Sequence, residues 1–329
     1  MHSRRLESRI LKATNLANRR FGLLAEGDRI LVAMSGGKDS YGLLWALQKL
    51  QAATPYKFEL VPYHLDQGQP GHDTSPIDGY LRALGVPYEI EKQDTYSRVI
   101  EMTEPGKTYC AVCSRFRRAI IYKAARRHDC NKVALGHHRE DLLETLLLNM
   151  FFEGKMKTMP PHLISDEGND RVIRPLCLVP ESELIELATQ KAFPIMPCNL
   201  CGSQEKERKA MKRLLEELTL RYPRVKTSML ASLGNVCKTH MLDPVLNPLY
   251  TDSHDRVPRP DAPGGRERLD LVDELDANDE RDANDEPEAN DELDAADGSL
   301  AAGSQGGRDV ELVQLGQPRA TLGAPSPLR

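Results

Sequence analysis

The stretch RILVAMSGGKDS, residues 29–40, joins an apolar run to a loop of small and polar residues. The apolar run, residues 30–34, predicts a buried strand, and the spacing of apolar residues over 39–50 predicts a helix directly after the loop. Two adjacent glycines allow backbone torsions that other residues avoid, so the loop amides can approach an anion closely. The start of the helix adds N–H groups and the positive end of a dipole. The stretch therefore predicts a phosphate-binding loop made of Ser35, Gly36, Gly37, Lys38, Asp39 and Ser40.

Apolar runs and helical patterns alternate along most of the chain. Further strands are predicted at 58–65, 87–91, 132–136 and 172–176, and further helices at 77–84, 114–128, 139–152, 181–191, 204–220 and 225–233. The alternation predicts an α/β fold, a doubly wound parallel sheet with helices on both faces. Ligands of such sheets bind at the carboxyl ends of the strands, where the strand order reverses. Because the loop at 35–40 leaves the carboxyl end of the first strand, we expect a nucleotide there.

Charge divides the 329 residues into a basic body and an acidic tail. The net charge is −5, but residues 251–329 carry −12 and residues 1–250 carry +7. The tail repeats Ala-Asn-Asp-Glu three times, and so charged a segment with few apolar residues is expected to stay disordered. A solvated appendage is the favoured interpretation over a mimic of nucleic-acid charge. We expect an N-terminal helix (1–25), an α/β domain with a C-terminal helical extension (26–240) and a disordered acidic tail (241–329).

The chain shows no pattern typical of secretion or of a membrane protein. The first helix is amphipathic, with Leu6, Ile10, Leu11 and Leu16 near one face, and has no continuous apolar stretch of the kind found in signal peptides. The longest apolar-rich run, residues 142–152, is interrupted by polar residues and is too short to span a bilayer. We therefore expect a soluble, cytoplasmic protein that does not engage a membrane.

Four of the seven cysteines form two Cys-x-x-Cys pairs, at 110 and 113 and at 198 and 201. An odd count without a secretion signal argues against a disulfide framework. From spacing alone, a structural four-cysteine zinc site ranks first. A redox dithiol and an iron–sulfur cluster held by fewer than four cysteines remain open. The other three, in apolar or helix-end settings, are expected to be packing residues: Cys130, Cys177 and Cys237.

The six-residue loop does not fit G-x-x-x-x-G-K-[ST], and a complete SGGKDS after a strand is unusual for a turn that binds nothing. It resembles the pyrophosphate loop of the PP-loop ATP pyrophosphatases, whose fold is Rossmann-like and which transfer AMP to a substrate oxygen. The segment 134–141, ALGHHRED, resembles the Gly-His-x-x-x-Asp segment of that superfamily, with Glu140 where relatives often have a second aspartate. The resemblance implies catalytic roles for Lys38, Asp39 and Asp141, and places His137 with the ATP-binding loop near the α-phosphate or its Mg²⁺.

Longer segments resemble one branch of that superfamily, the tRNA 2-thiocytidine synthetases. These are GKTYCAVCSRFRRAIIYKAA, ALGHHREDLLETLLLNMFFEGKMKTMPP and AFPIMPCNLCGSQ, supported by LDQGQPG (65–71) and VIRPL (172–176). The resemblance covers about residues 5 to 240. It implies a 4Fe-4S cluster held by Cys110, Cys113 and Cys201, with the fourth iron open to a sulfide. Cys198 is then spare, and spacing does not explain why Cys201 should be chosen over it.

The same resemblance implies a reaction. ATP adenylates the C2 oxygen of a cytidine, at position 32 of the anticodon loop in the family, and sulfur from the cluster displaces AMP to leave 2-thiocytidine. It also implies a cysteine desulfurase as sulfur donor and a homodimer. Two alternatives stay open: a wobble-uridine 2-thiolase of the same superfamily, whose members typically carry cysteines before the loop, and a non-catalytic, zinc-stabilised tRNA-binding module.

Basic side chains gather in three segments of the body, which favours a phosphate-binding surface for tRNA. Aromatic residues make up only 5% of the chain, so extensive base stacking has little support. Recognition is therefore expected to rest on tRNA shape, backbone charge and one extruded base. Beyond the basic first helix, the residues predicted to bind tRNA are Arg115, Arg117, Arg118, Lys155 and Lys157.

Overall fold

The computed structural model describes residues 2–103, 109–165, 170–196 and 206–247, and in this part of the chain it contains one six-stranded sheet. The strand order is β3-β2-β1-β4-β6-β5, and every neighbouring pair is parallel except β5 with β6. The strands are β1 (Arg29–Ala33), β2 (Glu59–Asp66), β3 (Glu89–Lys92), β4 (Lys132–Ala134), β5 (His162–Ile164) and β6 (Arg171–Ile173). The predicted doubly wound α/β fold is confirmed.

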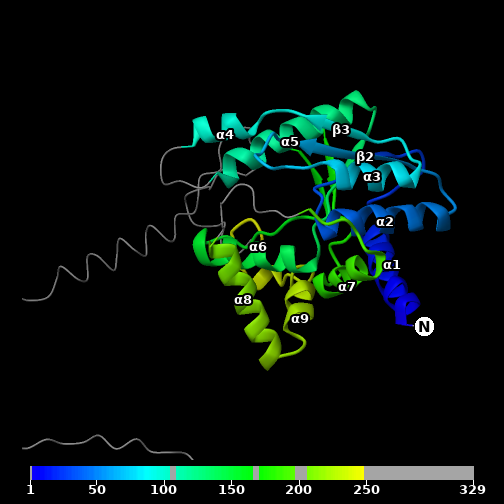
Figure 1. Cartoon of the computed structure of the whole chain (residues 1–329). Helices are drawn as coiled ribbons and strands as arrows, with labels where there is room; N and C mark the ends of the chain where they lie inside the picture. The colour runs from blue at the N-terminus through cyan, green and yellow to red at the C-terminus, as the bar shows by residue number, and fades with distance from the viewer. Residues whose placement is uncertain (1, 104–108, 166–169, 197–205, 248–329) are drawn as a thin grey trace, which may run out of the picture. The chain divides into compact units, whose positions relative to one another are not determined.

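The helices precede, connect and follow the strands (Figure 1). They are α1 (His2–Phe21), α2 (Lys38–Ala53), α3 (Ser75–Leu84), α4 (Tyr96–Met102), α5 (Cys110–Arg127), α6 (Arg139–Phe152), α7 (Glu181–Lys191), α8 (Lys206–Arg221), α9 (Val225–Ser232) and the short 3₁₀ helix Lys238–His240. None of the described helices is both long and apolar enough to cross a membrane.

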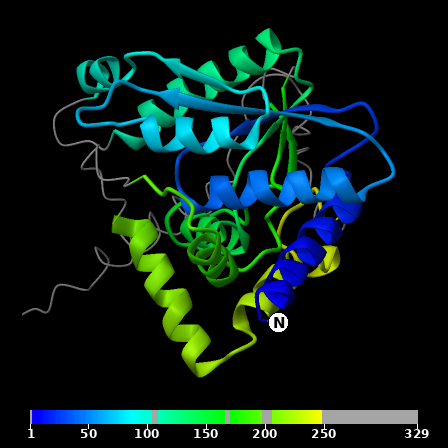
Figure 2. The ribbon, with the colours of Figure 1, turned by 45° about the vertical axis from the view of Figure 1, so that its right-hand side comes forward.

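Alternating side chains of β1 face two separate hydrophobic cores, because successive residues of a strand point to opposite faces of the sheet. Ile30 and Val32 pack into the larger core with residues of α1, α2, α3 and α7. Leu31 faces the other way and packs with Ile121 and Ala124 of α5. Figures 1 and 2 show α5 on one side of the sheet and α2 and α3 on the other.

The structure corrects several predicted elements. The basic helix begins at Cys110 rather than at 114, so the first cysteine pair lies in its first turn. Helix α4 and the antiparallel edge strand β5 were not predicted. On α1, Leu6 and Ile10 are fully buried, but Leu16 is 47% exposed because the buried face continues through Ala17. Of the segment predicted as an acidic tail, 241–329, residues 241–247 are described, and the rest lies outside the described residues.

The strand order reverses between β1 and β4. The chain leaves β1 toward β2 and β3 on one side, and returns through α5 to β4 on the other side of β1. The loops that follow these two adjacent strands lie at the carboxyl ends of the strands, where open α/β sheets bind ligands. The phosphate loop follows β1, and the segment 135–138 follows β4.

Candidate nucleotide and sulfur-transfer site

Gly36 occupies a backbone conformation that favours glycine. Its φ is 81°, and its carbonyl accepts a hydrogen bond from the Met196 N–H at 2.9 Å. A Cβ at this position would lie 2.8 Å from Met196 Sδ. The torsion and the close approach together exclude a larger residue, so the loop keeps a tight turn just before α2.

The two serines of the loop shape its backbone. Ser40 is buried, and its hydroxyl donates to the Gly37 carbonyl at 2.8 Å. Ser35 is exposed, and its Oγ accepts from the Gly37 N–H at 3.3 Å. These bonds hold the loop against the first turn of α2, whose N-terminus carries the positive end of the helix dipole.

The loop after β4 packs directly on the phosphate loop through Gly136. A Cβ at this position would lie 2.9 Å from the carbonyl oxygen of Asp39, so a side chain would force the two loops apart. Immediately beyond it, the backbone N–H of His138 donates to Asp141 Oδ2 at 2.8 Å at the start of α6. The structure therefore brings together Lys38, Asp39 and Asp141, which the sequence predicted as catalytic.

Lys38 lies between two carboxylates. Its Nζ is 3.0 Å from Asp39 Oδ2 and 3.2 Å from Oε1 of Glu181, the first residue of α7. On α8, Lys212 Nζ lies 2.8 and 2.9 Å from the two oxygens of the same Glu181 carboxylate. The sequence did not predict Glu181 or Lys212 as site residues. For Glu181, the available signal was its position directly after a proline, at the start of a predicted helix.

The buried histidine of the site is His138 rather than His137. His138 Nε2 lies 3.5 Å from Asp141, 3.8 Å from Glu181 and 4.0 Å from Asp39. The Nδ1 of His137 instead accepts a hydrogen bond from Arg174 Nε at 3.2 Å. Arg174 belongs to the VIRPL segment, and it ties the end of β6 to the loop after β4.

Burial and neighbouring charges shift the pKa values of this cluster. Burial alone would lower the pKa of Lys38, but the carboxylates of Asp39 and Glu181 outweigh it and raise that pKa. Burial raises the pKa of Asp39 against the opposing charge of Lys38. For Glu181, burial is outweighed by Lys212 and Lys38, which lower the pKa of the carboxyl. The lysine is therefore charged at neutral pH and Glu181 is anionic.

The two histidines titrate differently for the same reasons. Burial lowers the pKa of His137 to about 4, and the charge of Arg174 adds to this shift. Around His138, burial is outweighed by the carboxylates of Glu140 and Asp141, which raise its pKa. At neutral pH His137 is a neutral acceptor, while His138 holds a proton more readily than an ordinary histidine.

The donor set fits a nucleotide with a magnesium ion. Asp39 Oδ1 is a buried oxygen with no hydrogen-bond partner, close to the His138 side chain. No group of three His, Cys, Asp or Glu side chains within the described ranges could hold a metal ion alone. Mg²⁺ in ATP sites commonly takes one or two carboxylates and completes its shell with phosphate oxygens and water, so Asp39 and Asp141 suffice.

The cysteine site is described in part. Cys113 lies in the first turn of α5, and its Sγ is 3.4 Å from Oε1 of Gln67, in the loop after β2. The backbone of Cys110 begins the same turn, three residues earlier. Cys198 and Cys201 lie outside the described residues.

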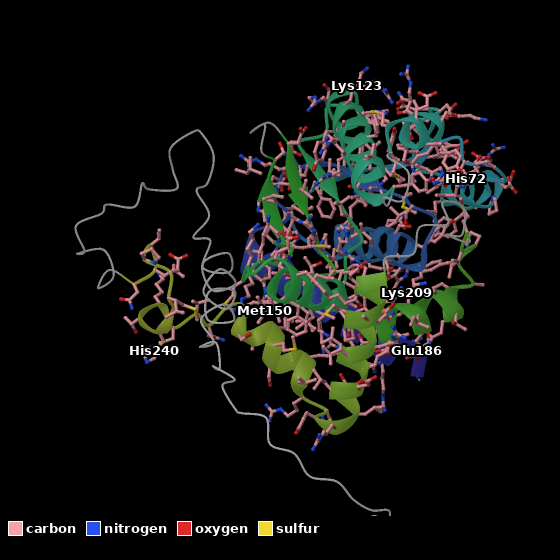
Figure 3. All side chains as sticks on the ribbon, turned by 90° about the vertical axis from the view of Figure 1, so that its left-hand side faces the viewer. His72, Lys123, Met150, Glu186, Lys209 and His240 are labelled. Carbon is pink, nitrogen blue, oxygen red and sulfur yellow. The ribbon has the colours of Figure 1, made fainter. Side chains whose placement is uncertain are left out.

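The predicted tRNA-binding residues lie in two segments of the chain. Arg115, Arg117 and Arg118 are exposed on α5, and Lys155 and Lys157 are exposed after α6. Lys123, also exposed on α5, is labelled in Figure 3. The next two arginines of α5 are used within the fold, because Arg126 pairs with Asp170 at 2.8 Å and Arg127 with Glu89 at 2.7 Å.

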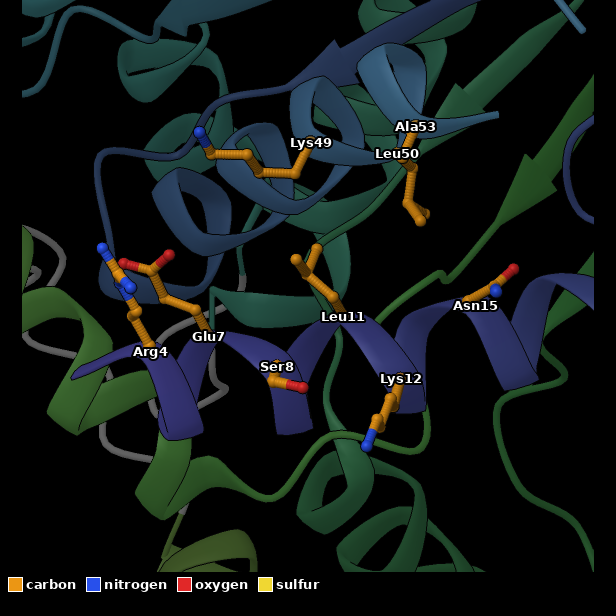
Figure 4. A pocket seen from close by; sticks show the side chains of 9 residues that line it. All are labelled: Arg4, Glu7, Ser8, Leu11, Lys12, Asn15, Lys49, Leu50 and Ala53. Carbon is orange, nitrogen blue, oxygen red and sulfur yellow. The ribbon is translucent and has the colours of Figure 1, made fainter. Parts of the chain in front are cut away.

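A hollow of about 410 Å³ lies between α1 and the second half of α2 (Figure 4). It is lined by side chains such as Arg4, Lys12 and Lys49, and contains none of the residues predicted to bind ATP or the cluster. The phosphate loop lies at the other end of α2, so this hollow is separate from the nucleotide site.

The fold and the loop at its switch point define a PP-loop protein. A family model described as the PP-loop domain matches residues 4–199. The tRNA-cytidine(32) 2-sulfurtransferase of Delftia acidovorans is 50% identical over 244 residues, 74% of this chain and 78% of the relative. That of Anaeromyxobacter dehalogenans is 49% identical over 259 residues, 78% of this chain and 89% of the relative. The chain therefore belongs to the tRNA-cytidine(32) 2-sulfurtransferase family of PP-loop proteins.

A solved structure supports the fold. The U34-tRNA thiolase NcsA from Methanococcus maripaludis, determined with its 4Fe-4S cluster, matches with a TM-score of 0.55. The match covers 70% of this chain and 79% of NcsA at 22% sequence identity. At that identity the likeness bears on the arrangement of strands and helices alone.

Proposed function

We propose that this protein is an ATP-dependent tRNA sulfurtransferase that converts the cytidine at position 32 to 2-thiocytidine. The observation that carries the proposal is the SGGKDS loop, which leaves β1 and meets the loop after β4 at the point where strand order reverses. Relatives about half identical over most of the chain have this activity by name. The enzyme class follows: a transferase that uses ATP and acts on tRNA.

The phosphate loop and its neighbours would carry the first step. The C2 oxygen of the cytidine attacks the α-phosphorus of ATP, the bond to the β-phosphate oxygen breaks, and pyrophosphate leaves. Lys38 and the start of α2 would stabilise the charge that develops on the departing phosphates. Asp39 and Asp141 would hold Mg²⁺ beside them, and His137 would lie at the α-phosphate side.

The cysteines would hold the sulfur-carrying cofactor. Positions 110 and 113 lie three apart in the first turn of α5, where the positive end of the helix favours anionic thiolates. With Cys201 they would make three ligands for a 4Fe-4S cluster. When bound, the cluster supplies sulfide at its open iron for the displacement of AMP. Before a cluster binds, Gln67 Oε1 would accept a hydrogen bond from the Cys113 thiol and hold that side chain beside the loop after β2.

The proposal extends to partners. Arg115, Arg117, Arg118, Lys155 and Lys157 would contact tRNA phosphates, since all five are exposed and charged. A cysteine desulfurase would renew the sulfide, and the protein would act as a homodimer. The division into 1–25, 26–240 and 241–329 remains a prediction. The buried Leu6 and Ile10 pack α1 into the same core as α2.

The function is tested by the nucleosides of tRNA. Mass spectrometry of tRNA from a strain lacking the gene should show no 2-thiocytidine, and the plasmid-borne gene should restore it. Loss of a 2-thiouridine instead would assign the wobble-uridine reaction. If the thionucleosides are unchanged, the proposed enzymatic activity is wrong, and a non-catalytic tRNA-binding protein becomes the favoured alternative.

The cofactor has its own test. Anaerobically purified protein should be brown and contain iron and acid-labile sulfide, and Cys110→Ser, Cys113→Ser and Cys201→Ser should each remove the colour and the thiolation. Cys198→Ser is the matched control and should keep both, because a fourth thiolate would close the open iron. Colourless, active protein with stoichiometric zinc would contradict the cluster. Equal damage from Cys198→Ser would indicate four-cysteine ligation.

A further inference from the structure

Helix α8 reaches the phosphate loop although it lies beyond residues 4–199, which the PP-loop domain model matches. Lys212 Nζ on α8 holds both oxygens of Glu181 at 2.8 and 2.9 Å. Oε1 of the same carboxylate lies 3.2 Å from Lys38 Nζ. A line of alternating charges therefore runs from α8 through the start of α7 to the loop lysine.

Packing determines where Lys212 points. The neighbouring Met211 and Leu215 are buried against Leu143 and Leu147 of α6. This apolar stripe fixes the rotation of α8 about its axis, because residues four apart share a face of a helix. Lys212 lies beside the stripe and is directed at the start of α7. Figure 1 shows α8 beside α6.

The backbone position of Glu181 is fixed by hydrogen bonds. Its backbone N–H donates to Oε2 of the buried Glu140 at 2.8 Å, which ties the first turn of α7 to the first turn of α6. The backbone N–H of Arg139 donates to the Val179 carbonyl at 3.0 Å and joins the same two segments. Glu181 therefore stands at a defined distance from Lys38.

The charge balance gives Lys212 a task. Lys38 faces the carboxylates of Asp39 and Glu181. The carboxylate of Asp141 also lies near, 3.5 Å from His138 Nε2, so the mouth of the loop is rich in carboxylates. A polyphosphate is repelled by each uncompensated carboxylate and competes with it for Lys38. Without Lys212, Glu181 would both repel the phosphates of ATP and compete with them for Lys38. With Lys212, its charge is largely balanced before the nucleotide arrives.

We infer that Lys212 is a positioning residue for ATP. Glu181 holds Lys38 at the mouth of the phosphate loop, and Lys212 balances the charge of Glu181. Lys38 is therefore positioned there and is still able to bind the phosphates. The inference rests on the proposed use of ATP and assigns part of the nucleotide site to the C-terminal helical extension. It concerns ATP affinity and leaves the cluster and the tRNA surface untouched.

The first test is the affinity for Mg·ATP of the full-length protein, measured by isothermal titration calorimetry, together with KM for ATP in tRNA thiolation. Lys212→Ala should raise the Kd for Mg·ATP and the KM for ATP by about tenfold each and change kcat by less than about twofold, in the range of charge-pair couplings. Lys212→Arg should restore both values, since it keeps the charge. Arg213→Ala, an exposed neighbour on α8, is the matched control and should leave them unchanged. Wild-type affinity in Lys212→Ala overturns the inference.

A double-mutant cycle separates positioning from direct phosphate contact. In a Glu181→Gln background, Lys212→Ala should change ATP affinity by less than about twofold, because the carboxylate through which Lys212 acts is gone. An undiminished loss in that background means that Lys212 touches ATP itself and overturns the inference. Thermal unfolding midpoints of all variants should stay close to wild type, and a drop parallel to the affinity loss assigns a merely structural role. A wild type that makes no 2-thiocytidine but binds ATP contradicts the proposed function alone.

Discussion

Lys38 is the residue on which the nucleotide chemistry depends, and its surroundings explain why. It is paired with Asp39 and Glu181, and their carboxylates raise its pKa despite partial burial. The ammonium is thus charged and placed at the loop mouth before ATP binds. A preorganised charge costs little reorganisation at the moment of reaction, which is why such groups contribute strongly to catalysis.

Removing this charge should stop the reaction and leave the protein folded. Lys38→Ala should lower thiolation by at least about a hundredfold, as for other removed transition-state donors. tRNA binding should persist, and the unfolding midpoint should change little because the lysine is partly exposed. Lys49→Ala, exposed on the same helix, is the control. The measurement is 2-thiocytidine formed per enzyme under saturating ATP, and wild-type turnover in Lys38→Ala would contradict the assignment.

His64 makes the stability of the fold depend on pH. It is 2% exposed, its Nδ1 contacts the Met34 carbonyl at 2.7 Å, and burial lowers its pKa below the ordinary 6.5. Below pH 6.5 the unfolded chain gains a proton that the folded state resists, so this residue should reduce stability as pH falls from 6.5 toward its folded pKa.

We predict that the free energy of unfolding depends more strongly on pH in wild type than in His64→Gln. Between pH 7.5 and 5.5, the free energy of unfolding of wild type should fall further than that of His64→Gln, which has no group that gains a proton on unfolding at this position. Urea titrations at each pH measure it, with the exposed His240→Gln as control. Parallel curves for wild type and His64→Gln would show that His64 does not carry the dependence.

At the scale of one element, α5 contributes to the cysteine site, to the hydrophobic core and to ion pairs within the fold. Its first turn carries the cysteine pair, and Ile121, Ala124 and Ala125 seal one face of the sheet. Near its end, Arg126 and Arg127 pair with acidic residues of the fold. The earlier arginines, at 115, 117 and 118, are exposed in the first half of the helix.

The exposed arginines of α5 predict how tRNA binding depends on salt. Arg117→Ala with Arg118→Ala should weaken binding of all tRNAs similarly and reduce the slope of log affinity against log salt by about 2, since each lost phosphate contact releases about one counterion fewer. Fluorescence anisotropy over a range of salt concentrations measures the slope. Arg82→Ala, on α3 at the other face of the sheet, should leave it unchanged. An unchanged slope in the double variant would move the tRNA surface away from α5.

At the scale of the whole molecule, charge and structure are distributed unequally. Every residue of the nucleotide site described above lies within 35–212, while residues 251–329 carry a net charge of −12. The contacts described above are all made within the basic body. We therefore predict that the acidic segment is dispensable for catalysis.

Truncation tests this division. Protein ending at residue 250 should keep the unfolding midpoint and make 2-thiocytidine within about twofold of the full chain, a change of less than about 0.5 kcal/mol in activation free energy. Protein ending at residue 246 should be less stable, because it lacks Asn247, which is 2% exposed and donates to the Thr239 carbonyl at 3.1 Å. Loss of activity in the longer version would give the tail a function in the reaction.

Local features of the chain predicted much of the fold. The periods of apolar residues placed α6 and α7 at their observed bounds, and placed β1 and α2 within one residue of their starts. The glycine at position 36 indicated a turn, and its φ of 81° confirms it. The edge strand β5 was not predicted because it has only three residues, two of them exposed, so its sequence shows no periodicity of apolar residues.

The sequence by itself determined the class of fold, the phosphate loop and the family, because strand and helix periods and glycine torsions depend on residues adjacent in the chain. Only the tertiary structure decided which charges meet there. It buries His138 rather than His137 among the carboxylates, and brings Glu181 and Lys212 to Lys38. Lys38, Glu181 and Lys212 lie far apart in the sequence, and each carries a charge that would be solvated on an isolated helix. They become partners because the apolar faces of α6 and α8 pack together, and that packing orients the side chains beside them.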